Sequence, residues 1–187
     1  MVDTPIVEPL RISDWALQED TTSPEEQAFE RRKQVIKSTW RAVQFGLDVK
    51  ATKIFYDRLF AEFPAVRSMF PEDMKAQYQK LYAAVSLTVK ALDNMEDLIP
   101  MLKDLGIRHS KYGVVPAHYA AVTECFLWTL NTYIHDQMPH HMGMLWSLDI
   151  TDAWEWALTF IGTTMSDAAE QAVRLERLQK RKRNSSS

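Results

Sequence analysis

Apolar residues recur at intervals of three and four along most of this chain, and this spacing places them on one face of an α-helix. Val35, Ile36, Trp40 and Val43 illustrate the pattern. The short alternating patterns that indicate strands do not occur in the sequence, and only 5 glycines and 8 prolines interrupt it. The sequence therefore predicts an all-α fold. Because 187 residues, 46% of them hydrophobic, can enclose one full core, we expect a single domain with tails.

Start and stop signals divide the chain into helices. Ser23, Pro24 and Glu26 form a capping box with proline at the first helical position, and Pro71 marks another start. Asn94 and Gly113 are suited to cap the two ends of one later helix. The expected helices span about 23–46, 47–62, 71–92, 94–113, 116–137 and 148 to beyond 175, with a short helical turn before Phe70. We expect residues 1–22 to form an extension that is at best partly ordered, 23–176 to form the domain, and 177–187 to form a basic, serine-containing tail.

Charge and composition exclude several classes of protein. The net charge of −3 is too small and too evenly spread to indicate a nucleic-acid-binding surface. The single cysteine, Cys125, excludes an intrachain disulfide, and the N-terminus lacks the pattern of a secretory signal. No apolar run approaches the ~18 residues that span a bilayer. We therefore expect a cytoplasmic protein without stable membrane insertion; the basic run 180–183 also suits nuclear import or anionic lipid, although such runs are usually only solvated.

His109 stands out in the segment LGIRHSKYG, because it lies in the last turn of a helix. A histidine there often only interacts with the carbonyl end of the helix dipole. However, His109 follows Leu98, Leu102 and Leu105 at helical spacing, so it faces the core. A core-facing imidazole needs a buried acceptor, a water molecule or a metal ion as its partner, and periodicity cannot choose among these.

Gln77 is the second unusual residue, since it is polar and shares an otherwise apolar stripe with Leu81. Its simplest interpretation is a surface position, and the same holds for Lys80. Tyr56 is able to pack its ring and bond a backbone carbonyl, and Phe70 can be an ordinary core aromatic.

Four segments, taken in order and spacing, resemble a known family. They are FYDRLFAEFPAVRSMFP (55–71), MKAQYQKL (74–81), LGIRHSKYGVVPAHY (105–119) and ITDAWEWALTFIG (150–162). The chain resembles globins of the three-over-three fold over roughly residues 30–172, and it is most similar to single-domain bacterial-type haemoglobins and the globin domain of flavohaemoglobins. The resemblance implies haem b, with its iron, as the cofactor.

The resemblance also assigns roles to individual residues. It makes His109 the proximal ligand of the haem iron, and Phe70 the aromatic residue against the porphyrin. Tyr56 and Gln77 would be the catalytic residues on the distal face, where each can donate a hydrogen bond to bound oxygen. The remaining residues implied at the cofactor are Lys80, Leu81, Leu105, Arg108, Tyr112, Val114 and Tyr119. Lys80 would contact a haem propionate, with direct ligation of iron as the rarer alternative.

One position departs from the family pattern. Relatives with redox chemistry support the proximal histidine with a tyrosine and a glutamate. Tyr119 matches the first, but Ala169 aligns with the second and Glu170 is its neighbour, which puts this support in doubt. Three further histidines, His135, His140 and His141, lack a tight metal-ligand spacing and are expected to be solvated.

The function implied is tight binding of O2 and other diatomic gases, with conversion of nitric oxide to nitrate as the enzymatic interpretation. No dinucleotide-binding motif occurs in the sequence, so the reductase would be a separate partner. A haem-based gas or redox sensor that signals through its terminal extensions, and a protein for O2 storage or delivery, are the non-enzymatic alternatives. Both a monomer and a homodimer are compatible with the sequence.

Overall fold

The computed structural model describes residues 23–44, 49–137 and 146–185. Within these ranges the regular elements are all helices and no strand occurs, which confirms the all-α prediction. The elements are α1 (Pro24–Gln44), α2 (Val49–Glu62), the 3-10 helix η2 (Pro64–Met69), α3 (Lys75–Ala91), α4 (Met95–Lys111), α5 (Pro116–Gln137) and α6 (Leu148–Ser185). His140 and His141 lie outside the described residues, as does the predicted extension 1–22.

The predicted caps hold the helix ends. Ser23 and Glu26 form the reciprocal pair of a capping box, since the Ser23 amide donates to Glu26 Oε2 (2.8 Å) and the Glu26 amide to Ser23 Oγ (3.2 Å). Asn94 accepts the Asp97 amide at the start of α4. Gly113 closes α4 with a φ of 85°, a conformation that glycine adopts without steric cost.

The predicted start of α3 at Pro71 is wrong, because the helix begins at Lys75. Arg67 explains the delay: its Nη1 donates to the carbonyl oxygens of Phe70 and Pro71, at 3.1 Å each. Those carbonyls are therefore bonded to a side chain from the preceding 3-10 helix, which holds residues 70–71 outside the helix. The Asp73 side chain instead accepts the Lys75 amide, at 3.0 Å.

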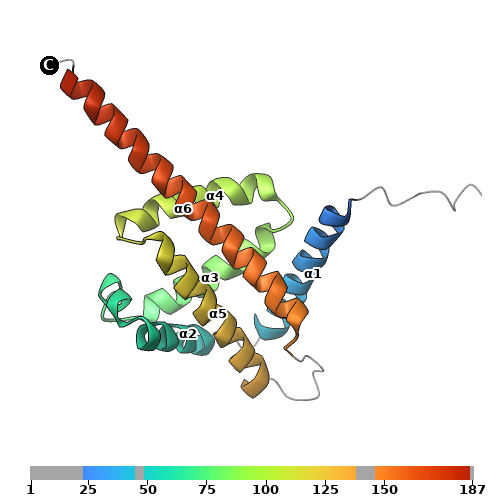
Figure 1. Cartoon of the computed structure of the whole chain (residues 1–187). Coiled ribbons are helices and arrows are strands. Elements are labelled where there is room, and N and C mark those ends of the chain that lie inside the picture. Colours follow the sequence, from blue (N-terminus) through green and yellow to red (C-terminus); the bar gives the residue numbers. More distant parts are fainter. Residues whose placement is uncertain (1–22, 45–48, 138–145, 186–187) are drawn as a thin grey trace, which may run out of the picture.

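The helices form two crossed layers (Figure 1). One layer holds α1, α3 and α4, which contact one another in the order α1–α3–α4, and the other holds α2, α5 and α6, in the order α2–α5–α6. The layers meet where α6 crosses α1 and α4 and where α2 crosses α3. This arrangement is that of a three-over-three globin fold. Among the described residues, no helix is long and apolar enough to cross a membrane.

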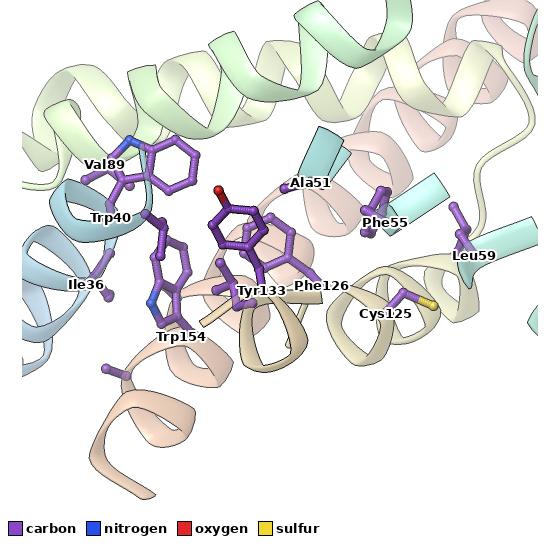
Figure 2. Close-up of a cluster of buried hydrophobic side chains, with 14 of the residues drawn as sticks. Ile36, Trp40, Ala51, Phe55, Leu59, Val89, Cys125, Phe126, Tyr133 and Trp154 are labelled. Carbon is purple, nitrogen blue, oxygen red and sulfur yellow. The ribbon is translucent and has the colours of Figure 1, made fainter. Parts of the chain in front are cut away.

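The core lies between these layers and is rich in aromatic rings (Figure 2). Trp154 of α6 contacts Trp40 of α1 and Phe126 of α5, with ring centroids 6.3 and 5.5 Å apart. Phe55 of α2 packs edge-on against Phe126, at 6.2 Å. One aromatic cluster thus connects four helices, and burial of rings of this size dominates the stability of such a core.

Gly106 sets the distance between α4 and α6. A Cβ atom at this position would lie 2.2 Å from the carbonyl oxygen of Met165 and 2.6 Å from its Cα. The two helix backbones therefore meet at a point that has room only for glycine. This contact holds the second half of α4, which carries His109, against α6.

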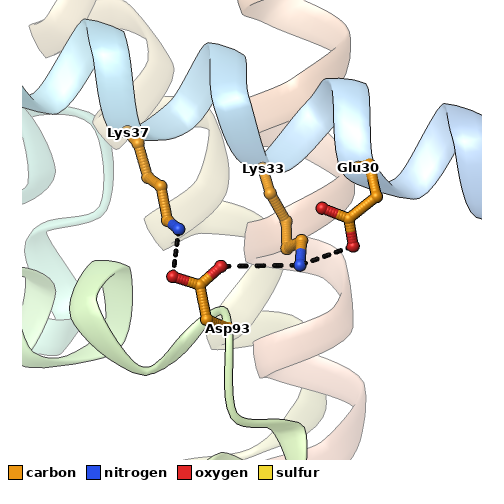
Figure 3. A network of polar contacts seen from close by, with 4 residues as sticks. All are labelled: Glu30, Lys33, Lys37 and Asp93. Atoms are coloured by element: carbon orange, nitrogen blue, oxygen red, sulfur yellow. Dashed lines mark hydrogen bonds and ion pairs between the residues drawn. The ribbon is translucent and has the colours of Figure 1, made fainter. Parts of the chain in front are cut away.

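A charged network links α1 to the turn between α3 and α4 (Figure 3). Asp93 of that turn pairs with Lys37 and Lys33, and Lys33 Nζ also lies 2.6 Å from Glu30 Oε1. Lys33 is buried, and a buried charge needs compensation. The carboxylates of Glu30 and Asp93 provide it.

Candidate cofactor site

The last turn of α4 orients the ring of His109. Its Nδ1 lies 2.9 Å from the carbonyl oxygen of Leu105, one turn earlier in the same helix. A carbonyl oxygen only accepts hydrogen bonds, so Nδ1 is the nitrogen that carries a proton here. In the neutral form of this half-buried ring the lone pair is therefore on Nε2, which is the nitrogen that can bind a metal.

The turn that follows holds this histidine in place. The amides of Tyr112 and Val114 both donate to the carbonyl oxygen of His109, at 3.0 and 3.2 Å. The Gly113 amide donates to the Ser110 carbonyl oxygen, at 3.0 Å. The carbonyl groups of His109 and Ser110 at the end of α4 are thus satisfied by amides of the turn, and the imidazole bonds neither of them.

Tyr56 and Gln77 meet although 21 positions separate them in the sequence. Gln77 Nε2 of α3 donates to Tyr56 Oη of α2, at 3.0 Å. Since the hydroxyl oxygen accepts here, its own proton remains available for a further acceptor. Burial raises the pKa of Tyr56 above its ordinary value, so this proton is retained at neutral pH. The pair therefore forms a compact donor group.

Phe70 lies beside this donor pair. Its ring centroid is 5.3 Å from that of Tyr56 and 5.3 Å from that of Phe60. Arg67 fixes the position of Phe70, because it donates to the Phe70 carbonyl oxygen and stacks over the Phe60 ring. The structure thus brings Tyr56, Phe70 and Gln77 together in one aromatic corner.

The other predicted cofactor residues fall into two groups. Those with half-buried side chains, which offer apolar surface that a flat ligand can cover, are Leu81, Leu105, Val114 and Tyr119. Those with exposed side chains are Lys80, Arg108 and Tyr112. Arg108 forms an ion pair with Asp104 at 2.9 Å, and Tyr112 is 70% exposed. The roles of both groups toward a cofactor stay predictions.

Among the described residues the His109 ring has no carboxylate partner, because its Nδ1 donates to a backbone carbonyl oxygen. Tyr119 packs against Gly162, where an added Cβ would lie 3.0 Å from the tyrosine Cβ. Ala169 and Glu170 line the same groove as Tyr119, but the Glu170 side chain is exposed. A neutral imidazole bonded to a carbonyl donates less electron density than one bonded to a carboxylate.

Sequence reasoning missed three residues of this site. They are Tyr78, whose ring centroid lies 5.8 Å from that of Tyr56; Arg67, which positions Phe70; and Gly106, which sets the distance between α4 and α6. An isolated glycine inside a helical pattern was a usable signal for Gly106. Tyr78 had none, since it acts through a contact between two helices, and the bonds from Arg67 to the Phe70 and Pro71 carbonyls belong to no motif that the sequence shows.

No second metal site occurs in the described part of the chain, where no group of three or more histidine, cysteine, aspartate or glutamate side chains is placed to hold an ion. The exposed His135 lies 3.0 Å from its neighbour Asp136. Cys125 is buried in α5, at 1% exposure.

Sequence comparisons support one family. The family model for globins matches residues 53–165. A flavohemoprotein of Bacillus subtilis is 30% identical over 147 residues, which make up 74% of this chain and 34% of the relative. An uncharacterized globin-like protein of Aquifex aeolicus is 26% identical and covers 70% of this chain and 86% of its own. The chain spans only a quarter to a third of the length of the flavohemoproteins that it matches.

Solved structures show the same fold. A bacterial globin from Campylobacter jejuni aligns with a TM-score of 0.62 at 23% identity and covers 78% of this chain and 99% of its own. An engineered carbene transferase from Rhodothermus marinus, whose parent is provisionally named a nitric oxide dioxygenase, aligns with a TM-score of 0.64 at 23% identity over 79% of this chain and 97% of its own. With the family model matching more than half of its length, this chain belongs to the globin family and is of the bacterial type.

Proposed function

We propose that this globin binds haem b, that His109 Nε2 is the protein ligand of its iron, and that the site converts nitric oxide and O2 to nitrate. The observation that carries the proposal is the hydrogen bond from His109 Nδ1 to the Leu105 carbonyl oxygen, because it makes Nε2 the nitrogen that has the lone pair in the neutral imidazole. Haem, when bound, would supply an iron that binds O2 and changes its oxidation state.

The distal residues would favour ligands that carry negative charge. Tyr56 keeps a proton that Gln77 does not use, and the surrounding rings of Phe60, Phe70 and Tyr78 exclude water from it. A donor in a dry site stabilises partial charge on an acceptor by about 1.5–3 kcal/mol. This pair would therefore select O2, which would acquire such charge on binding, over carbon monoxide, which would not, and it would slow the release of O2.

Slow release of O2 suits a reaction better than transport. One nitric oxide, one O2 and one electron together give one nitrate ion, so the site must be supplied with one electron per turnover. The flavohemoprotein relatives, whose name pairs a flavin with a haem, support a flavin-containing electron donor, and we propose that this donor is a separate protein. The role of the chain itself would be to hold O2, exclude water and admit a small neutral gas.

Reconstitution with hemin tests the cofactor assignment. Free hemin has a broad Soret band of its own, so the signal to follow is the sharper, shifted band of imidazole-ligated haem. The wild-type chain is expected to show this band, and His109→Gly is expected to lose it and regain it when free imidazole is added. His135→Gly is the matched control, because this histidine is exposed and its partner in the described part of the chain is its neighbour Asp136. A Soret band that His109→Gly leaves unchanged would reject His109 as the ligand.

Nitrate production tests the reaction. With a chemical reductant, nitric oxide and O2 are expected to give stoichiometric nitrate over many turnovers, and Tyr56→Phe is expected to lower the yield per bound O2. Tight O2 binding without turnover would reject the enzymatic function and favour a sensor or a storage protein.

A further inference from the structure

A groove of about 860 Å³ runs between the C-terminal half of α6 and the turn after α4. One wall contains Ser110, Val114 and Tyr119, and the other wall is α6 from Ser166 to Arg181. Figure 1 shows that the C-terminal end of α6 projects beyond the other helices. The groove therefore has an inner end near His109 and an outer end on the projecting helix.

The outer end of the groove carries positive charge that is not neutralised. Arg174, Arg177 and Arg181 line it at helical spacing, and in the described part of the chain none of them has an ion-pair partner. The carboxylates in the groove, Asp167 and Glu170, lie nearer its inner end on α6. Three unpaired guanidinium groups on one helical stripe are suited to bind carboxylates of another molecule.

Apolar side chains beside these arginines are also exposed. Val115, Val173 and Leu178 line the groove and are 47%, 39% and 46% exposed. A surface that combines exposed apolar groups with a rim of arginine has the composition of a protein interface.

The inner wall of the groove leads directly to the candidate iron ligand. Val114 lines the groove, and its amide donates to the carbonyl oxygen of His109, at 3.2 Å. A molecule seated in the groove is therefore separated from the histidine by one residue and one hydrogen bond.

We propose that this groove is the docking surface for the electron donor of the site, a redox protein that presents a carboxylate-rich surface. The proposal rests on the proposed function, because it assigns the place where the required electron enters. The arginines would steer the donor, and the apolar groups would retain it close to His109.

A pair of charge-reversal variants tests the proposal. The groove variant is Arg174→Glu with Arg177→Glu and Arg181→Glu. The control variant is Lys180→Glu with Lys182→Glu and Arg183→Glu, which changes the net charge by the same amount on the same helix but at residues that do not line the groove. The probe is an acidic plant-type ferredoxin, in oxidised form for binding isotherms and in reduced form for the rate of haem reduction.

We expect the groove variant to weaken ferredoxin binding and to slow reduction by at least about tenfold at low salt, since steering of this kind accounts for about 10- to 1,000-fold in association rate. The control variant should change both by less than about threefold, and about 0.5 M salt should remove the difference because charges are then screened. Equal effects of the two variants, or no binding by the wild-type chain, would overturn the proposal.

Reduction by a neutral quinol separates this proposal from the proposed function. It should proceed at the same rate in all three proteins, and a protein that makes no nitrate with quinol would contradict the proposed reaction while the binding isotherm still tests the groove. A last variant tests whether the chain's own N-terminal segment occupies the groove. In it, each aspartate and glutamate of residues 1–22 is replaced by asparagine or glutamine in the full chain. If this variant binds ferredoxin tenfold tighter, and only when the groove arginines are present, the occupant is the chain's own N-terminal segment and the proposal is overturned.

Discussion

Gln77 Nε2 lies 3.0 Å from Tyr56 Oη and donates a hydrogen bond to it, so the hydroxyl proton of Tyr56 is available to another acceptor. The contact joins α2 to α3 and makes a donor of defined direction from two residues that are otherwise ordinary. Removing the Tyr56 hydroxyl, with removal of the Tyr78 hydroxyl as the control, measures what this donor contributes to binding.

Tyr56→Phe removes that donor and keeps the ring. If the hydroxyl bonds bound O2 with ~1.5–3 kcal/mol, its loss should speed O2 dissociation by about one to two decades, measured by stopped-flow replacement with carbon monoxide. Tyr78→Phe is the control, because its ring is close to Tyr56 and its hydroxyl has no hydrogen-bond partner among the described residues. Equal dissociation rates for the two variants would contradict the donor role of Tyr56.

Arg67→Met should weaken cofactor retention. Arg67 binds the carbonyl oxygens of Phe70 and Pro71, so its loss frees the segment that carries Phe70. We expect hemin transfer to an apo-globin acceptor to be about 3- to 30-fold faster, which corresponds to one or two lost hydrogen bonds. Arg58→Met is the matched control, since Arg58 also stacks on a ring, that of Trp128, and also has a polar partner, Glu62. Similar transfer rates in both variants would show that Arg67 has no role in positioning Phe70.

Gly106→Ala should destabilise the fold although alanine is the better helix former. The new methyl group would meet the backbone of Met165, which cannot move without separating α4 from α6. Overpacking of this kind costs about 1–3 kcal/mol, against a gain of about 1 kcal/mol in helix propensity. Urea unfolding of the apo-protein measures the change. Gly162→Ala is the control, because its methyl group meets a side chain, that of Tyr119. If Gly106→Ala lowers the free energy of unfolding no more than Gly162→Ala does, Gly106 does not set the distance between α4 and α6.

Asp93→Asn should destabilise the chain in a pH-dependent manner. The hydrogen bond from Lys37 lowers the pKa of Asp93 below its usual value, and the charges of Lys37 and Lys33 act in the same direction. A carboxyl group with a lowered folded-state pKa stabilises the fold above its unfolded pKa of about 4, and this contribution disappears as the pH falls through the lower folded-state value. At pH 7 we expect a loss of no more than about 1 kcal/mol, since Asp93 is largely solvent-exposed.

Urea unfolding of the wild-type chain and Asp93→Asn from pH 7 down to pH 2 measures this dependence. The two stabilities should converge at the acid end. Asp57→Asn, which breaks an exposed pair with Lys53 within α2, should have a smaller effect. A difference that stays constant with pH would show that the Asp93 carboxylate does not act through its charge.

The sequence by itself determined the local structure of this protein. Helical periodicity, the Ser23 and Asn94 caps and the turn at Gly113 were all legible, because each depends on hydrogen bonds between residues no more than about four positions apart. The same reasoning placed His109 on the core side of its helix. The helix start predicted at Pro71 was wrong although its cause is also local: Arg67 bonds the Phe70 and Pro71 carbonyl oxygens through its side chain, and the start and stop patterns used here describe no such bond.

Only the tertiary structure decided which side chains meet. The bond between Gln77 and Tyr56, the pairing of Asp93 with Lys37 and the contact of Gly106 with Met165 each join different elements, and each depends on the angle and height at which two helices cross. The packing of all the helices together determines the angle and distance at which two of them cross, so a short stretch of sequence cannot predict this geometry. The arginine-lined groove beside His109 has the same origin, because it exists only where α6 continues past the turn that ends α4.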